Sequence, residues 1–486
     1  MTSGSVNSLL AKANRLVKKK DFSAAKKIYD SILSKYPSNQ EAKKELENLI
    51  TIQGKKSNVP IELIKTISDY YSQGNLREAF EMIEKADSDY KTNHLLLNLK
   101  GAIYSKNLDD QKALESFEKS IQIEPYAGET HNARGFALFR LNLFDEAELA
   151  FRRALELNPK NSAAHNNLGV LFLECNRLED AEMSFQCAIQ QKNDYYEAYI
   201  HLGNVLQKME KVPEAMECYK KAVTINPNLF EGHVNLGNTL KGLGQNKQAI
   251  DSYKMALALN PQAKHVQHLL DSLTGKTTEV APKEYVAKVF DEYAPRFERH
   301  LTIDLQYNTP TKLRNMFDNF AEIFPDKAKN AVDLGCGTGL CGIAFNGVYE
   351  KICGIDLSSK MLEEAKKKNI YDKLILGDLI DSLDTHAYKF DLFISADTFI
   401  YLGNLFRVFE SAAKRAAPNA RFIFTTESCE TEPYILGKSG RYSHSFSYIE
   451  SVCKKNGFII LKYLRDKLRK EPEGWVLGGF YLAKRD

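Results

Sequence analysis

The chain of 486 residues has little that points to metal, disulfide or membrane chemistry. Its eight cysteines form no CxxC pair, so the sequence predicts neither a zinc site nor a disulfide framework and favours a reducing, cytoplasmic setting. It has no run of 18 apolar residues, and its N-terminus lacks an apolar core of signal-peptide length, so we expect no membrane span. The net charge of +3 is too small to predict binding to nucleic acid.

A 34-residue repeat fills much of the first half of the chain. Small residues at two positions let two antiparallel helices approach closely, and an aromatic residue fills the gap against the next unit. A proline starts the turn that follows, where its missing N–H costs nothing. The recurring residues are Gly101, Gly135, Gly169, Gly203 and Gly237; Ala113, Ala147, Ala181, Ala215 and Ala249; Phe117, Phe151, Phe185, Tyr219 and Tyr253; and Pro125, Pro159, Pro227 and Pro261.

This pattern resembles the tetratricopeptide repeat (TPR), which implies an α-solenoid of stacked helix pairs over residues 1–275. Each helix pair of such a solenoid contacts mainly its neighbours, so the last pair needs a closing helix. We place regular units near 94–127, 128–161, 162–195, 196–229 and 230–263, less regular units near 6–39 and 60–93, and the closing helix at 264–273.

The pattern changes after a linker at residues 276–283. From 284 to 486, apolar runs alternate with helical stretches, which predicts an α/β domain with a mostly parallel, doubly wound, seven-stranded sheet. The ligand of such a sheet is expected at the carboxyl ends of its central strands. We expect strands near 330–334, 351–356, 373–377, 390–396, 420–426, 457–464 and 475–484, and helices at 284–296, 309–323, 339–346, 358–368, 404–416 and 446–455.

A glycine-rich stretch, AVDLGCGTGL at Ala331–Leu340, follows the first of these strands. Glycine lets the backbone turn tightly and approach a ligand closely. A dinucleotide-binding fingerprint has glycines at the first, third and sixth positions, whereas here the sixth position is Leu340 and an acid, Asp333, precedes the first glycine. The spacing therefore disfavours an NAD-dependent oxidoreductase.

The pattern D-x-G-x-G-x-G resembles motif I of class I S-adenosylmethionine-dependent methyltransferases, and the resemblance extends over residues 284–486. It implies a Rossmann-like fold, S-adenosyl-L-methionine as cofactor, a ribose-binding carboxylate at Asp356, and Asp378 near the adenine amino group. A carboxylate suits ribose because it accepts hydrogen bonds from both hydroxyls. The expected cofactor-binding residues are Asp333, Gly335, Cys336, Gly337, Gly339, Asp356, Leu357, Asp378, Leu379, Ala396 and Tyr293.

Candidates for the acceptor side lie at the fourth strand and in a long segment after the fifth. Asp397 ends the fourth strand, and Tyr442 and His444 belong to a segment too long for a plain connection, which is typical of functional lids. Methyl transfer requires alignment and sometimes removal of a proton, so these three are the candidate catalytic residues and no metal is required. The alternatives are a solvated surface loop here, and plain core packing for the aromatic residues near Tyr293.

One polar side chain per repeat falls on the helix face expected to line the concave groove of the array. Asparagine offers a paired donor and acceptor, which suits the backbone of an extended peptide. The alternative is a solvent-facing polar stripe. The groove candidates are Asn167, His201, Asn204, Asn235 and Asn238.

Two hypotheses follow for the whole chain. The first is an S-adenosylmethionine-dependent methyltransferase whose TPR array recruits a protein or peptide as substrate or partner. The second is a TPR scaffold with a cofactor-binding but non-catalytic methyltransferase-like domain. The combination of array, FDEYAPRF, DLGCGTGL and SGRYSHS resembles a group of bacterial TPR-containing methyltransferases, which implies an activity class but no acceptor.

Overall fold

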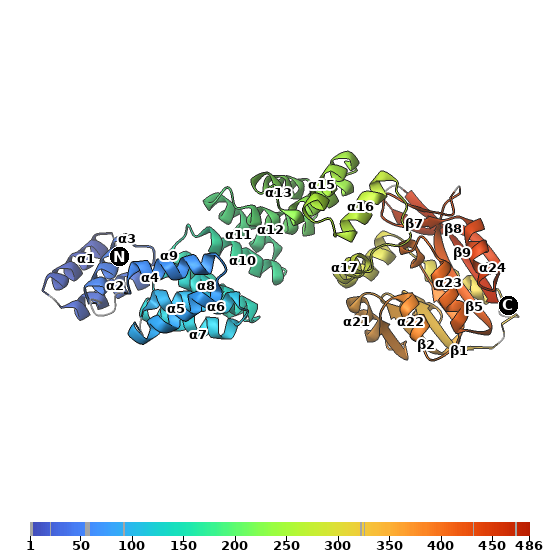
Figure 1. Cartoon of the computed structure of the whole chain (residues 1–486), viewed down its shortest axis with the longest axis horizontal. Coiled ribbons are helices and arrows are strands. Elements are labelled where there is room, and N and C mark those ends of the chain that lie inside the picture. The colour runs from blue at the N-terminus through green and yellow to red at the C-terminus, as the bar shows by residue number, and fades with distance from the viewer. Residues whose placement is uncertain are drawn as a thin grey trace. The chain divides into compact units, whose positions relative to one another are not determined.

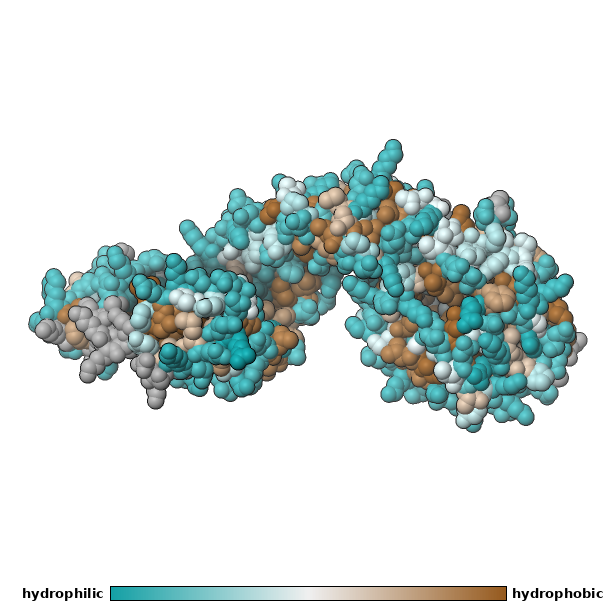
Figure 2. All heavy atoms as spheres, in the orientation of Figure 1, coloured by the Kyte–Doolittle hydropathy of each residue, from teal (hydrophilic) through white to brown (hydrophobic). Residues whose placement is uncertain are grey.

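The computed structural model describes residues 3–19, 21–53, 59–90, 93–320, 323–324, 326–430, 432–471 and 474–486. The chain forms two units, Met1–Thr239 and Leu240–Asp486, which are described separately. Among the described residues, none of the helices combines the length and the apolar character needed to cross a bilayer. Hydrophilic side chains cover most of the surface that Figure 2 presents.

The first unit consists of helices that pair consecutively along the chain (Figure 1). Glycine and aromatic side chains explain the close pairing: a Cβ added to Gly169 would lie 2.7 Å from the ring of Phe185, which is fully buried. The helices are α1 Ser3–Lys18, α2 Phe22–Lys35, α3 Gln40–Gln53, α4 Ile61–Ser72, α5 Leu76–Asp89, α6 His94–Lys106, α7 Asp110–Ile123, α8 Gly128–Arg140, α9 Phe144–Leu157, α10 Ser162–Glu174, α11 Leu178–Gln191, α12 Tyr196–Lys208, α13 Val212–Ile225 and α14 Phe230–Gly242.

The second unit begins at the end of α14 and includes the last repeat helices as well as the α/β domain. Its remaining helices are α15 Asn246–Leu259, α16 Lys264–Thr274, α17 Lys283–Tyr293, α18 Phe297–Arg299, α19 Thr309–Asp318, α20 Leu340–Ala344, α21 Ser359–Lys367, α22 Leu379–Thr385, α23 Phe406–Arg415 and α24 Phe446–Lys455. Its strands are β1 Ala328–Leu334, β2 Tyr349–Asp356, β3 Lys373–Leu376, β4 Phe390–Ser395, β5 Ala416–Ser428, β6 Tyr434–Leu436, β7 Tyr442–His444, β8 Phe458–Glu471 and β9 Gly474–Arg485.

The strands form one sheet in which β3, β2, β1, β4 and β5 are neighbours in that order and all parallel, so β1 lies between β2 and β4. β9 pairs antiparallel with β5, and β8 pairs only with β9 among the described strands. The predicted fold class, an α-solenoid followed by a Rossmann-like domain with a mostly parallel sheet, is confirmed. All seven expected strands are present, and the short strands β6 and β7 bring the number among the described residues to nine.

Both faces of this sheet are buried, as parallel strands require. Phe393 and Phe422 pack on one face beneath α23 and α24, whereas Leu392 and Ile394 pack on the other with Phe317 of α19. The central strands therefore read as continuous apolar runs, and the polar side chains at their carboxyl ends stand out.

The expected linker, residues 276–283, is bonded to the α/β domain rather than free. Val280 forms an isolated β-bridge with Leu402, and the N–H groups of Gly403 and Asn404 each donate to the carbonyl of Glu279 at 2.8 Å. The N–H of Leu436 also donates to the Thr277 hydroxyl at 3.2 Å. The segment is thus part of the second unit.

Candidate active site

A cavity of about 900 Å³ lies at the carboxyl ends of the central strands. Its lining comes from the segments that directly follow β1, β2, β3 and β4, where an α/β sheet is expected to hold its ligand. Of the expected cofactor-binding residues, it brings together Gly335, Cys336, Gly337, Asp356, Leu357, Asp378, Leu379, Ala396 and Tyr293.

The glycine loop has left-handed backbone at all three glycines. Gly335 has φ +71°, and a Cβ there would lie 2.3 Å from the Thr398 side chain, so the fold itself excludes a side chain. Gly337 has φ +52°, but the nearest atom to an added Cβ is a Phe297 ring carbon at 3.8 Å. The Gly337 backbone therefore faces open cavity space, which is what close approach to a ligand needs.

Asp356 ties the end of β2 to this loop. One carboxylate oxygen accepts from the Gly337 N–H at 2.8 Å, and the other accepts from the Ser358 N–H at 2.8 Å. Burial raises the pKa of Asp356, and these backbone hydrogen bonds oppose the increase. Because each carboxylate oxygen can accept more than one hydrogen bond, Asp356 retains acceptor capacity toward the cavity that it lines.

Asp333 and Gly339 are not among the residues that line the cavity. Asp333 is 1% exposed and accepts a 2.7 Å hydrogen bond from the Tyr371 hydroxyl. Burial raises its pKa to about 7 despite that bond. Gly339 precedes α20 with φ +96°, and an added Cβ would lie 3.0 Å from the Tyr371 ring. Both residues lie next to Tyr371 rather than on the wall of the cavity.

Asp378 begins α22, where its side chain accepts from the N–H groups of Ile380 and Asp381. Lys283 of α17 pairs with Asp378 at 3.3 Å, and this lysine also lines the cavity. The carboxylate oxygens of Asp378 are thus partly occupied by N–H groups of its own helix and by Lys283. The neighbouring Leu379 presents an apolar side chain to the same cavity.

Aromatic side chains from α17 and the turn after it form another wall of the cavity. The Phe290 and Phe297 rings lie 5.9 Å apart and the Tyr293 and Phe297 rings 5.3 Å apart, each pair edge to face. The Tyr293 hydroxyl also contacts Nδ1 of His300, in the π-helical turn His300–Asp304. These aromatics line the cavity, and Phe290 also packs against the buried cluster that includes Val286 and Leu436, so this wall of the cavity is at the same time part of the core.

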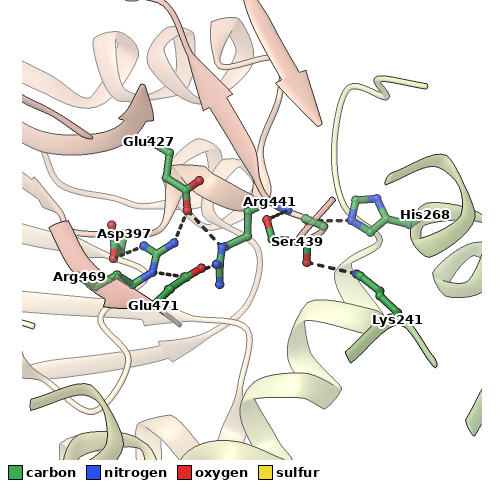
Figure 3. A network of polar contacts seen from close by, with 9 residues as sticks. Lys241, His268, Asp397, Glu427, Ser439, Arg441, Arg469 and Glu471 are labelled. Atoms are coloured by element: carbon green, nitrogen blue, oxygen red, sulfur yellow. Dashed lines mark hydrogen bonds and ion pairs between the residues drawn. The ribbon is translucent and has the colours of Figure 1, made fainter. Parts of the chain in front are cut away.

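A cluster of five charged side chains lies at the β4 and β8 side of the cavity (Figure 3). Arg469 of β8 pairs with Asp397 at 2.8 Å, with Glu471 at 2.9 Å and with Glu427. Arg441 pairs with Glu427 at 3.1 Å and with Glu471. Three carboxylates thus face two guanidiniums, and this charge-pairing raises the pKa of Arg469 against the effect of burial. We call this group the ion-pair cluster.

Asp397 has one carboxylate oxygen that takes no part in the ion-pair cluster. Its Oδ2 binds Arg469, whereas its Oδ1 is buried and has no hydrogen-bond partner. Its backbone is left-handed, with φ +55°, and its N–H donates to the Thr425 hydroxyl at 3.0 Å. A strained non-glycine backbone that aims a carboxylate at a cavity is typical of functional sites.

Tyr442 and His444 do not line the cavity. Tyr442 is fully buried, and its hydroxyl bonds the Thr278 hydroxyl at 2.5 Å. His444 donates from Nε2 to the carbonyls of Leu402 at 2.8 Å and Gly403 at 3.1 Å, and burial lowers its pKa to about 4. Both side chains hold β7 against neighbouring segments, so the structure gives no support to the prediction that they contact a substrate.

Most of the ion-pair cluster was not predicted from the sequence. Arg469 and Glu471 lie beyond the strand expected at 457–464, because β8 runs on to residue 471. The sequence signal for it was the run of charged residues at Arg465–Glu471, which is interrupted only by Leu468. Leu468 is buried. Among the described residues, no group of three or more His, Cys, Asp and Glu side chains is arranged to hold a metal ion.

Several groove candidates of the first unit bond side chains of adjacent repeats. Asn167 donates to Asn132 at 3.0 Å, and Asn235 donates to Asn204 at 3.2 Å. Asn204 also accepts from the Tyr219 hydroxyl at 2.7 Å, while the His201 ring stacks on Phe185. Asn238 is exposed. The asparagines therefore link adjacent repeats, and their role toward a peptide stays a prediction.

Comparison with known proteins agrees with this geometry. Residues 325–476 match a family model described as a methyltransferase domain. The chain carries a methyltransferase domain. Two family models described as tetratricopeptide repeat match residues 132–196, and 196–229 with 230–262, so the TPR array is shown as well.

Three relatives match parts of the methyltransferase-containing chain. The biotin biosynthesis bifunctional protein BioHC of Saccharophagus degradans is 28% identical over 33% of this chain and 32% of its own length. The malonyl-[acyl-carrier protein] O-methyltransferase of Priestia megaterium is 30% identical over 30% and 52%. The 18S rRNA (guanine-N(7))-methyltransferase of Bos taurus is 34% identical over 18% and 32%. The chain spans a third to a half of these relatives.

Proposed function

We propose that this protein is an S-adenosylmethionine-dependent methyltransferase whose TPR array recruits a protein or peptide. The observation that carries the proposal is the pairing of Asp356 with the Gly337 N–H at the carboxyl ends of adjacent strands, on the wall of a cavity about 900 Å³ in volume. Asp356 is where a ribose-binding carboxylate is needed, and Gly337 leaves the backbone open to a ligand.

The residues that line the cavity fit S-adenosylmethionine. Asp356 would accept from the ribose hydroxyls, the Gly335–Gly337 backbone would pack against the cofactor, and Asp378 with Leu379 would flank the adenine. Tyr293 and Phe297 would cover it and exclude water. When bound, the cofactor supplies a methyl group activated on a sulfonium, so the protein needs mainly to align the acceptor.

Asp397 is the residue we assign to the acceptor. Asp397 lines the cavity, and Arg469 holds its carboxylate in position at 2.8 Å, so we assign the carboxylate the role of accepting a hydrogen bond from the nucleophilic group. Tyr442 and His444 have other partners, so we give them no part in the reaction. In the array, Asn167, His201, Asn204, Asn235 and Asn238 remain our proposed peptide contacts, because asparagine amides pair with peptide backbone.

Isothermal titration with S-adenosylhomocysteine tests the cofactor site. We expect wild-type protein to bind, Asp356→Ala to weaken binding at least tenfold, and Asp318→Ala to bind as wild type, since Asp318 is an exposed residue of α19 that pairs with Arg314 and does not line the cavity. A wild-type protein that binds no S-adenosylhomocysteine contradicts the proposal. Wild-type affinity in Asp356→Ala contradicts the assignment of the site.

Transfer of a tritiated methyl group separates the enzyme from a scaffold. Full-length protein is incubated with labelled S-adenosylmethionine and a cell lysate, beside the Asp397→Asn variant. An enzyme labels an acceptor and the variant loses most of that label. A TPR scaffold with a non-catalytic domain binds S-adenosylhomocysteine but labels nothing.

A further inference from the structure

A tight turn, Gly437–Arg441, joins β6 to β7 at the edge of the cavity. Within it, the Gly437 N–H donates to the Arg441 carbonyl at 2.8 Å and the Gly440 N–H donates to the Gly437 carbonyl at 2.9 Å. Gly440 has φ +87°, which favours glycine. The turn ends on Arg441, so its position decides where that guanidinium lies.

Two side chains of the repeat helices hold this turn from outside (Figure 3). Lys241, at the end of α14, donates to the Ser439 carbonyl at 3.4 Å, and His268 of α16 bonds the Gly440 carbonyl at 3.0 Å through Nε2. Because a carbonyl oxygen only accepts, Nε2 of His268 carries the proton. His268 is 3% exposed and its ring lies 5.6 Å from the ring of Tyr285.

The same turn delivers Arg441 to the ion-pair cluster. Arg441 bridges Glu427 and Glu471, the two carboxylates that also hold Arg469, and Arg469 in turn holds Asp397. A continuous chain of contacts therefore runs from the helices that end the TPR array to the carboxylate proposed to meet the acceptor. All of these residues belong to the second unit.

We infer that Lys241 and His268 are positioning residues of the active site, which act on the acceptor end of the cavity by fixing the Gly437–Arg441 turn and hence Arg441. This inference rests on the proposed methyl transfer. Most of the cofactor residues lie at the ends of β1, β2 and β3, with Ala396 after β4 and Tyr293 on α17 as the exceptions. The cluster takes Asp397 from the end of β4, Glu427 from β5, and Arg469 and Glu471 from β8, so the two ends of the cavity are supported mainly by different strands. The repeat helices thus support acceptor binding and do not change the affinity for the cofactor.

The electrostatics of the contact suit this role. Burial lowers the pKa of His268, so near neutral pH the ring is neutral and acts as a hydrogen-bond donor rather than as a charge. Burial, aided by the nearby Arg441, lowers the pKa of Lys241 to about 8. The turn carbonyls thus receive one neutral and one cationic donor, and Gly440 leaves no side chain between them and the helices.

Hydrogen exchange of the full-length protein tests the contact without any acceptor. His268→Ala should speed exchange of the Gly437 and Gly440 amides about tenfold, because the turn loses a buried hydrogen bond. His268→Gln retains a donor and should restore most of the protection. The matched control is Lys264→Ala, an exposed residue of the same helix, which should leave these amides unchanged. Equal exchange in wild type and His268→Ala overturns the inference.

A double-mutant cycle tests whether the contact acts through Arg441. His268→Ala and Arg441→Gln should each lower methyl transfer about tenfold with S-adenosylhomocysteine affinity within twofold of wild type, and the double variant should fall no further. Independent losses in the double variant, or a parallel loss of S-adenosylhomocysteine affinity, overturn the positioning role. A wild type that binds no S-adenosylhomocysteine refutes the proposed function instead, and hydrogen exchange still decides the contact.

Discussion

Arg469 binds three carboxylates although only 4% of its side chain is exposed. An arginine suits this place because its planar guanidinium presents several donors in a fixed geometry and stays charged when buried. Each of its three nitrogens has a carboxylate partner, so the arginine organises side chains from three separate segments of the chain.

Replacing Arg469 with methionine should destabilise the second unit by about 3–5 kcal/mol, because it leaves buried carboxylates without a counter-charge. Trp475 is the single tryptophan and lies on β9, so its fluorescence in urea reports this unit. The control is Arg465→Met, which removes an exposed pair with Glu430 and should cost less than about 1 kcal/mol. Equal losses in both variants would contradict the role of the ion-pair cluster.

Asp333 should make stability depend on pH. Its pKa of about 7 in the folded protein is above the usual carboxyl value of 3.8, so between these values the folded protein holds a proton that the unfolded chain has lost. The contribution is fully present below about pH 4 and is lost as the pH rises through 7. Asp333→Asn should therefore flatten the decline in stability between about pH 4 and pH 7, measured by urea unfolding; an unchanged slope would show that Asp333 does not hold this proton.

At the scale of single elements, the glycine loop separates a folding requirement from a binding requirement. Gly335 packs against Thr398, whereas Gly337 faces the cavity, although both have positive φ. An alanine at either position costs about 1–2 kcal/mol for its left-handed backbone. Only at Gly335 would the alanine methyl group also clash with another side chain, that of Thr398.

Gly335→Ala should therefore lower the stability of the second unit more than Gly337→Ala, since its Cβ would lie 2.3 Å from Thr398. Gly337→Ala should fold but lose S-adenosylhomocysteine affinity, because its methyl group points into the cavity. Urea unfolding and titration calorimetry measure the two effects. Wild-type affinity in Gly337→Ala would show that the ligand does not approach this backbone.

The elements that the sequence predicted well are those specified by local pattern. The 34-residue spacing and the glycine loop are visible within short windows, and Asp356 and Asp378 are marked by their place at strand ends. The ion-pair cluster was not predictable in this way, because Arg469 meets Asp397 across 72 positions of the chain. His444 was misplaced for a related reason: its segment forms a buried strand, β7, too short to show a period.

At the scale of the whole molecule, the division between units falls inside the TPR array rather than after it. The helices α15 and α16 belong to the unit that holds the methyltransferase domain, and His268 of α16 contacts the Gly437–Arg441 turn. A methyltransferase fragment cut at the end of the array would therefore expose a surface that is buried in the intact protein.

A fragment of residues 230–486 should retain wild-type S-adenosylhomocysteine affinity and unfold as one transition. A fragment of residues 280–486 lacks α15, α16 and Glu279, whose carbonyl accepts from the N–H groups of Gly403 and Asn404, and its melting temperature should fall by several degrees. Differential scanning calorimetry with and without ligand measures both. Equal melting temperatures would place the functional boundary at the linker instead.

The 34-residue repeat of the TPR array has a consequence for how this protein evolves. Regular units that contact mainly their neighbours can be duplicated or lost by in-frame recombination without disturbing the reactive centre. The final helix pair is the exception, since its closing helix bonds the Gly440 carbonyl. Lineages of this protein should therefore vary in the number of their internal units while inheriting the last pair and the methyltransferase domain together, as a single heritable block.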